Sequence, residues 1–200
     1  HCESSAASDV YKRQGRGWAN KIIHNENAYN ALSLFFNSKD KFTLGVCNGC
    51  QMLSNLKEII PGSSHWPSFT HNNSNQFEAR QVLVKIPKSN SILFKGMHES
   101  IIPIIVSHGE GKVTVSKSND LKKITMAYVD DSGKKTTSYP NNPNGSVSGA
   151  TGFCNNDGRI NIMMPHPERL MHINNFSWVP PKWKISPWIK IFNNAREWVD

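Results

Sequence analysis

The stretch "TLGVCNGCQML", from Thr43 to Leu53, places a cysteine where one hydrophobic pattern gives way to another. The residues before Cys47 predict a short buried strand over 42–46, and those after it keep helical spacing as far as Ile60. Glycines at 45 and 49 allow a sharp turn between the two elements. A cysteine between strand and helix is the nucleophile-elbow arrangement, with a thiol in place of the usual serine.

The start of a helix suits a thiolate. The helix dipole and the free backbone N–H groups favour negative charge there, and the N–H of Asn48 can donate to an oxyanion formed beside Cys47. Cys50 lies one turn further along and is expected to face the packing interface. The C-x-x-C spacing leaves two other interpretations open, a thioredoxin-like redox pair and a structural zinc site with Cys154 and a histidine.

A base for such a thiol is present in "MMPHPERLM", residues 163–171. His166 follows an apolar strand predicted over 158–164, and the carboxyl ends of strands are where sites assemble in open α/β sheets. His166 can accept the thiol proton and later give a proton to a leaving amine. Glu168 can hold the tautomer of the imidazole.

Helical and strand patterns alternate at both ends of the chain and hairpin-like strands occupy its middle, which predicts a mixed α/β layer architecture. Proline in the apolar run 101–106 indicates an edge strand or a strand start. Residues 1–14 show no period of 2 or 3.6 and are interpreted as an unstructured or foreign extension, so the predicted domain is 15–200. The predicted elements are helices at 18–37, at 48–60 and from Pro187 to Trp198, and strands at 42–46, 77–86, 101–106, 111–116, 124–130 and 158–164.

Composition excludes several classes of protein. The 200 residues suffice for one domain, and the net charge of +8 comes from scattered lysines, so nucleic acid is not expected as a partner. No apolar run approaches the roughly 20 residues that span a bilayer, so neither membrane insertion nor a secretory signal is expected. Four cysteines are too few for a disulfide framework, which favours a reducing, cytoplasmic location.

The residues from Gly45 to Gln51 fit the pattern G-x-C-x-G-x-Q, and the order Cys47…His166-x-Glu168 completes a second pattern. Together they resemble the class I (triad) glutamine amidotransferases. Other stretches, over about residues 15–200, are similar to the amidotransferase domain of large, single-chain phosphoribosylformylglycinamidine synthases. These stretches are "GRGWA", "PGSSHWPSF", "NSNQFEAR", "VSHGEGKV", "YPNNPNGS" and the tryptophan-rich C-terminal segment.

This resemblance implies a flavodoxin-like, three-layer mixed sheet and an ATP-dependent ligase that converts formylglycinamide ribonucleotide to formylglycinamidine ribonucleotide in purine biosynthesis. Glutamine would be hydrolysed here and its ammonia passed to a synthetase domain of the same full-length chain. ATP and Mg²⁺ would bind in that domain, and this domain would hold no cofactor or metal. The implied site residues are Cys47 as nucleophile, His166 as general base and acid, Glu168 as its orienting group, and Gln51, Asn48 and His108 as substrate-binding groups.

The family's domain begins earlier than "GRGWA", with strands and a Gly-Gly-Phe-type loop that donates one oxyanion N–H. The sequence therefore predicts a fragment truncated at its N-terminus, with an incomplete sheet and weak or no activity alone. Loss of one oxyanion donor costs about 10²–10³ in rate in a comparable enzyme. Two further alternatives stay open: another class I amidotransferase or related cysteine hydrolase, and a non-catalytic module.

Overall fold

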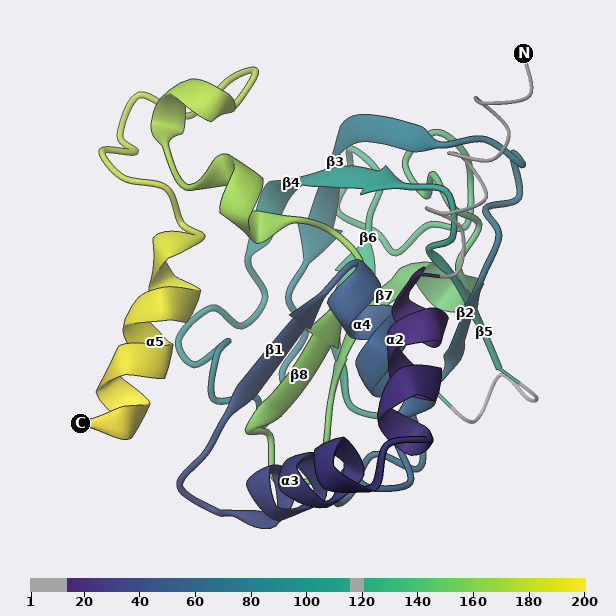
Figure 1. The fold of residues 1–200 in the computed structure, drawn as a ribbon. Coiled ribbons are helices and arrows are strands. Elements are labelled where there is room, and N and C mark those ends of the chain that lie inside the picture. The colour runs from purple at the N-terminus through teal and green to yellow at the C-terminus, as the bar shows by residue number, and fades with distance from the viewer. Residues whose placement is uncertain (1–13, 116–120) are drawn as a thin grey trace.

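A computed structural model describes residues 14–115 and 121–200 (Figure 1). Helices surround one strand at the start of this part of the chain, strands follow one another through its middle, and a helix ends it. The helices are α2 (Gln14–Ile23), α3 (Glu26–Asn37), α4 (Asn48–Asn55) and α5 (Ile189–Val199). The strands are β1 (Thr43–Val46), β2 (Ser68–Thr70), β3 (Glu78–Lys85), β4 (Ile101–His108), β5 (Lys112–Thr114), β6 (Ile124–Tyr128), β7 (Ala150–Cys154) and β8 (Ile160–Met163).

Six strands form one mixed sheet in the order β1-β8-β7-β6-β3-β4, while β2 and β5 form a separate pair. β1 and β8 run parallel, and every other neighbouring pair of the large sheet is antiparallel. β1 and β8 are far apart in the sequence, but because they are parallel neighbours their carboxyl ends lie side by side. The predicted α/β fold with a mixed sheet and flanking helices is confirmed.

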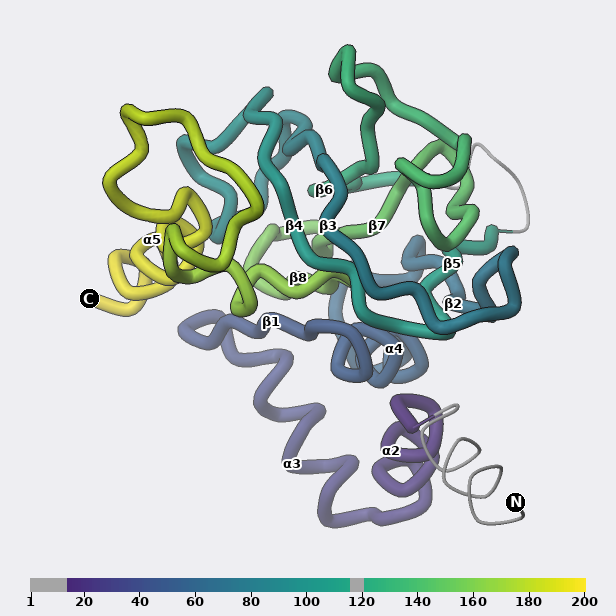
Figure 2. Tube along the Cα trace, turned by 90° about the horizontal axis from the view of Figure 1, so that it is seen from above, coloured from purple at the N-terminus to yellow at the C-terminus, as the bar shows by residue number. Residues whose placement is uncertain are grey.

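Hydrophobic clusters cover both faces of this sheet. On one face α2, α3 and α4 pack through Ala19, Phe36 and Leu53 against inward side chains of β7 and β8. On the other face the C-terminal segment packs through Trp188 and Ile191 against β3, β4 and β6. Figure 2, seen from above, shows α2, α3 and α4 on one side and the C-terminal segment on the other. The layers are therefore helix, sheet and helix.

The N-terminal helical region differs from its prediction. The continuous helix expected over 18–37 is two helices, α2 and α3, because the side chain of Asn25 caps the second one by accepting from the Ala28 N–H at 2.9 Å. The extension predicted at residues 1–14 falls almost entirely outside the described residues, and Gln14 is the first residue of α2. None of the helices described in residues 14–115 and 121–200 has the length and apolarity needed to cross a membrane.

Further elements differ from the predictions, and the short strand β2 is not among the predicted strands. Helix α4 ends at Asn55 and not near Ile60, and turns occupy the residues that follow. The fully buried strand β7 is not predicted, because its sequence "ATGFC" does not alternate between apolar and polar residues and contains a glycine. The run with Pro103 is predicted to be an edge strand or the start of a strand, and the structure shows the edge, since β4 is the last strand of the sheet.

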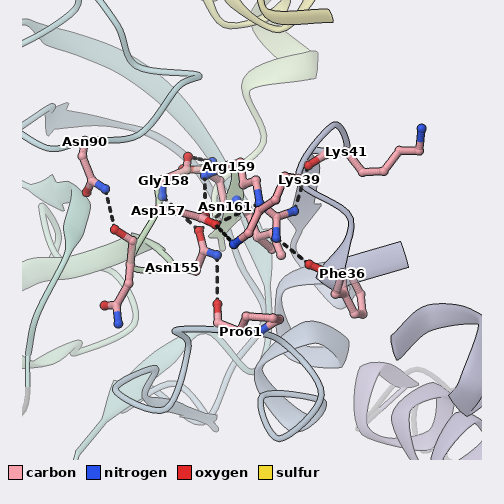
Figure 3. Close-up of polar contacts among 12 residues, drawn as sticks. Phe36, Lys39, Lys41, Pro61, Asn90, Asn155, Asp157, Gly158, Arg159 and Asn161 are labelled. Atoms are coloured by element: carbon pink, nitrogen blue, oxygen red, sulfur yellow. Dashed lines mark hydrogen bonds and ion pairs between the residues drawn. The ribbon is translucent and has the colours of Figure 1, made fainter. Parts of the chain in front are cut away.

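Arg159 anchors the strand that leads to Cys47. Its buried guanidinium donates to the carbonyls of Phe36 at 2.5 Å and Lys41 at 2.9 Å, and pairs with Asp157 at 2.9 Å (Figure 3). Its own carbonyl accepts from the Thr43 N–H at 3.1 Å, at the first residue of β1. A charged donor shared between the end of α3 and the start of β1 fixes where that strand begins.

Candidate active site

Cys47 lies at the sharp turn between β1 and α4. Its backbone has φ 53° and ψ −110°, a combination that non-glycine residues rarely adopt and that functional sites often hold. The Cys47 N–H still donates to the Met163 carbonyl at 2.9 Å, so the turn begins directly where pairing with β8 ends. Gly45 permits the turn, because a Cβ there would lie 2.6 Å from the Leu53 side chain and 2.8 Å from the Gly49 carbonyl oxygen.

His166 and Glu168 lie at the end of the neighbouring strand β8. The His166 N–H donates to the Ile105 carbonyl at 2.8 Å, which ties this segment to β4. The ring nitrogen Nδ1 lies 2.5 Å from Glu168 Oε1. Because β1 and β8 are parallel neighbours, their carboxyl ends bring Cys47 and His166 to the same place. The three residues predicted as nucleophile, base and orienting group are therefore close together in space.

The charge of His166 depends on both of its neighbours. Burial alone would lower its pKa, but hydrogen bonding to Cys47 and Glu168, together with their charges, raises it to about 9. Burial also raises the pKa of Glu168, but hydrogen bonds from His166 and from the backbone, together with the charges of His166 and Arg169, outweigh this and lower the pKa. His166 Nε2 is buried, and the neighbouring Cys47 thiol acts on the ring through hydrogen bonding and charge. The arrangement favours an imidazolium beside the sulfur.

A cavity of about 410 Å³ opens at Cys47. One wall is the start of α4, a second is the turn after β4, and a third is the loop that leads into β3. Cys47 Sγ lies 3.9 Å from the Ser107 carbonyl oxygen, which brings the thiol to the end of β4. The lining residues are Cys47, Asn48, Gln51, His71, Asn75, Gln76, Phe77, Ser107, His108, Gly109 and Glu110.

The other predicted site residues lie in the walls of this cavity. Gln51 is nearly buried, and its Nε2 donates to the Glu110 carbonyl at 2.5 Å, which joins α4 to the turn after β4. Asn48 is the first residue of α4, where a backbone N–H has no preceding turn of helix to bond. His108 is 3% exposed, and both of its ring nitrogens lack a hydrogen-bond partner among the described residues. Burial, and secondarily the charge of His166, lower the pKa of His108 to about 3, so its ring is neutral.

The alternative roles for the cysteine pair find no support in the described residues. Cys50 is fully buried in the core, as predicted, and burial raises the pKa of its thiol, which makes it a poor redox partner. Cys47, Cys50 and Cys154 are all free thiols. In residues 14–115 and 121–200 no group of three or more His, Cys, Asp or Glu side chains is placed to hold a metal ion.

Sequence reasoning missed one wall of the cavity, the loop 71–77. This loop contributes His71, Asn75, Gln76 and Phe77, and Phe77 is 65% exposed. Its residues form part of "THNNSNQFEAR", where a family resemblance is the one signal that the sequence offers. A run of small polar residues before a strand is the pattern of many ordinary turns, so no local chemistry marks it as part of a site.

The geometry can be compared with known proteins. A family model for the CobB/CobQ-like glutamine amidotransferase domain matches residues 2–199. The chain belongs to this family. For a glutamine amidotransferase domain, a cysteine elbow, a histidine–glutamate pair and a cavity beside the thiol form a coherent set, because amide hydrolysis through a thioester needs a nucleophile, a proton carrier and room for the substrate.

Two solved structures are similar to this chain, and the first of them has the same fold. PurLQS from Thermotoga maritima matches with a TM-score of 0.67 and 21% identity, covering 96% of this chain and 74% of that one. A GMP synthase component from Thermoplasma acidophilum matches with a TM-score of 0.48 and 13% identity, covering 89% of this chain and 67% of that one. The first likeness shows that this glutamine amidotransferase domain shares its fold with PurLQS.

Proposed function

We propose that this domain hydrolyses glutamine through a thioester on Cys47 and releases ammonia for a synthetase. The observation that carries the proposal is the meeting of Cys47, in a strained elbow, with the His166–Glu168 pair beside a cavity of about 410 Å³. Membership of the glutamine amidotransferase family supports glutamine as the substrate.

The reaction follows from the positions of these groups. The Cys47 thiolate attacks the side-chain carboxamide carbon of glutamine, and the resulting oxyanion accepts a hydrogen bond from the Asn48 N–H. The C–N bond breaks as the His166 imidazolium gives its proton to the departing nitrogen, which leaves as ammonia. Water then gives a proton to His166 and attacks the thioester. The C–S bond breaks, glutamate leaves and the thiolate is restored.

In this proposal Gln51 and His108 act in substrate binding, and Glu168 orients His166. Gln51 holds the Glu110 carbonyl in place and so shapes the cavity beside the thiol. His108 offers a neutral imidazole whose buried nitrogens have no partner among the described residues, and an unmet polar group of this kind costs about 1–3 kcal/mol. A substrate that hydrogen-bonds to the ring would recover that energy. Glu168 keeps the proton of His166 on the nitrogen that faces the carboxylate.

At a finer level, we infer that the ammonia serves a phosphoribosylformylglycinamidine synthase. The family motifs of the sequence and the fold shared with PurLQS support this assignment. The full enzyme would then be an ATP-dependent ligase of purine biosynthesis in the cytoplasm, with ATP and Mg²⁺ bound by the synthetase part and no cofactor needed at Cys47. The synthetase partner would belong to the same full-length chain.

The thioester itself is the direct test of the glutaminase chemistry. The full-length protein is mixed with glutamine, quenched in acid within the first turnover, digested and examined by mass spectrometry. We expect a glutamyl group on the peptide that contains Cys47, and its absence in the Cys47→Ser variant. A glutamyl group on Cys154, or none on any cysteine while ammonia is released, would overturn the proposal.

A further inference from the structure

Asn72 is a buried side chain that joins two walls of the cavity. It is 1% exposed, and it precedes the part of the loop that contributes Asn75, Gln76 and Phe77. Its Nδ2 donates to the Gln76 carbonyl at 2.9 Å and to the His108 carbonyl at 2.8 Å. One amide group is therefore bonded both to its own loop and to the end of β4.

The same side chain also fixes the far end of the turn after β4. Asn72 Oδ1 accepts from the Gly111 N–H at 3.0 Å, and the Asn72 N–H donates to the Gly109 carbonyl at 3.0 Å. Gly111 has to be glycine here, because a Cβ on it would lie 2.0 Å from the His108 ring. Asn72 thus fixes the position of Gly111, against which the His108 imidazole packs. All hydrogen-bonding groups of this side chain are used within the two walls.

A second buried asparagine completes the support from the opposite side. Asn144, which is fully buried, donates through Nδ2 to the Gly111 carbonyl at 2.8 Å, and its backbone carbonyl accepts from the Asn73 N–H at 3.1 Å. Gly111 is therefore held at its N–H by one asparagine and at its carbonyl by the other. Two buried, fully bonded amides give a rigid connection, because each lost bond would leave a polar group unpaired.

We propose that Asn72 is a positioning residue that sets the width of the glutamine pocket. It does so by fixing its own loop, 71–77, against the end of β4 and the turn that follows it, residues 107–111. This inference rests on the proposed glutaminase function. Asn72 is not among the residues that line the cavity. Its loss should therefore change how well a glutamine-shaped molecule fits into the cavity and leave the reactivity of the Cys47 thiol unchanged. Loss of its hydrogen bonds lets the two walls of the cavity separate and lets Gly111 move, so that the His108 ring can change its orientation.

Two cysteine reagents separate fit from reactivity. Iodoacetamide is small and reports the Cys47 thiolate, while a diazoketone shaped like glutamine must first occupy the pocket. Both rates are measured on the full-length protein and on its Asn72→Ala, Asn72→Asp and Asn73→Ala variants. Asn73 is the control, since it is the next residue of the same loop and its side chain is exposed, while its backbone N–H makes the bond to Asn144 that alanine would keep.

In Asn72→Ala we expect labelling by the diazoketone to fall at least about tenfold and labelling by iodoacetamide to change by less than about twofold. KM for glutamine should rise more than kcat falls. Asn72→Asp is isosteric and keeps the acceptor for the Gly111 N–H, but it loses the donor to the Gln76 and His108 carbonyls, so it should change the ratio of the two rates in the same direction. Asn73→Ala should resemble the unaltered protein with both reagents.

Equal slowing by both reagents in Asn72→Asp, or no change in the diazoketone rate in Asn72→Ala, would overturn the positioning role. If the unaltered protein reacted with iodoacetamide but not with the diazoketone, the proposed glutaminase function would fail, and that result is separate from any effect of Asn72. The ratio of the two rates therefore tests the inference without depending on the total amount of folded protein.

Discussion

At the scale of single residues, the imidazole of His166 lies between a carboxylate and a thiol, and these neighbours set its charge. Burial lowers the pKa of His166, but Cys47 and Glu168 together raise it to about 9, above the ordinary value of 6.5. A raised folded-state pKa stabilises the folded protein at pH values below about 6.5, and this contribution is lost as the pH rises towards 9. The site should thus be most stable while His166 carries a proton.

The Glu168→Gln variant tests this account. We expect the pKa of His166 to fall by about one to two units, because the amide keeps a hydrogen bond but not the charge. The imidazole titration is followed by NMR, and unfolding by denaturant at pH 6 should show a loss of stability that shrinks at pH 10. The exposed Glu197→Gln variant on α5 is the control and should leave the titration unchanged. A His166 titration that stays near pH 9 in Glu168→Gln would contradict the assignment.

At the scale of elements, helix α4 packs against β1 at the distance that Gly45 allows. A Cβ at Gly45 would lie 2.6 Å from Leu53 and 2.8 Å from the Gly49 carbonyl oxygen, whereas a Cβ at Gly49 would have nothing within 4 Å. The sequence predicts that the glycines on both sides of Cys47 allow the turn. Only Gly45 is required by the space around it.

Alanine at each glycine should therefore have opposite effects. Gly45→Ala is expected to cost about 1–3 kcal/mol of unfolding free energy, as overpacking of a tight contact does. Gly49→Ala, inside a helix and facing open space, should stabilise by up to about 1 kcal/mol. Both values are measured by denaturant unfolding. Equal destabilisation by the two substitutions would mean that the strand and helix do not approach as the structure has them.

Local pattern was sufficient for some elements and not for others. The strand before Cys47 could be predicted from the sequence, since its apolar run and the flanking glycines are local features. The sequence also indicated Cys47, His166 and Glu168 as a set, and the structure places them close together. The break at Asn25 was missed because one capping hydrogen bond decides it within an otherwise helical pattern. The loop 71–77 could not be placed, because its position depends on bonds from Asn72 to residues some forty positions later.

At the scale of the whole molecule, the sheet brings together Cys47 and His166, which are far apart in the sequence. After β1 and α4 the chain passes through β3, β4, β6 and β7 before β8 returns to lie parallel to β1. Cys47 and His166 meet because of that return, while the turn after β4 and the loop before β3 close the cavity from the far edge. The chemistry of the site thus depends on the order of the strands and not on any one segment.

The measurement that tests the central claim most directly compares two nitrogen sources in the full-length enzyme. With Cys47→Ser we expect synthesis of formylglycinamidine ribonucleotide from glutamine to disappear, while synthesis from added ammonium salt persists at close to its original rate. Cys50→Ala, which changes the neighbouring buried thiol, should retain glutamine-dependent synthesis. If Cys47→Ser lowered both activities equally, or left the glutamine-dependent activity intact, Cys47 would not be the residue that releases ammonia from glutamine.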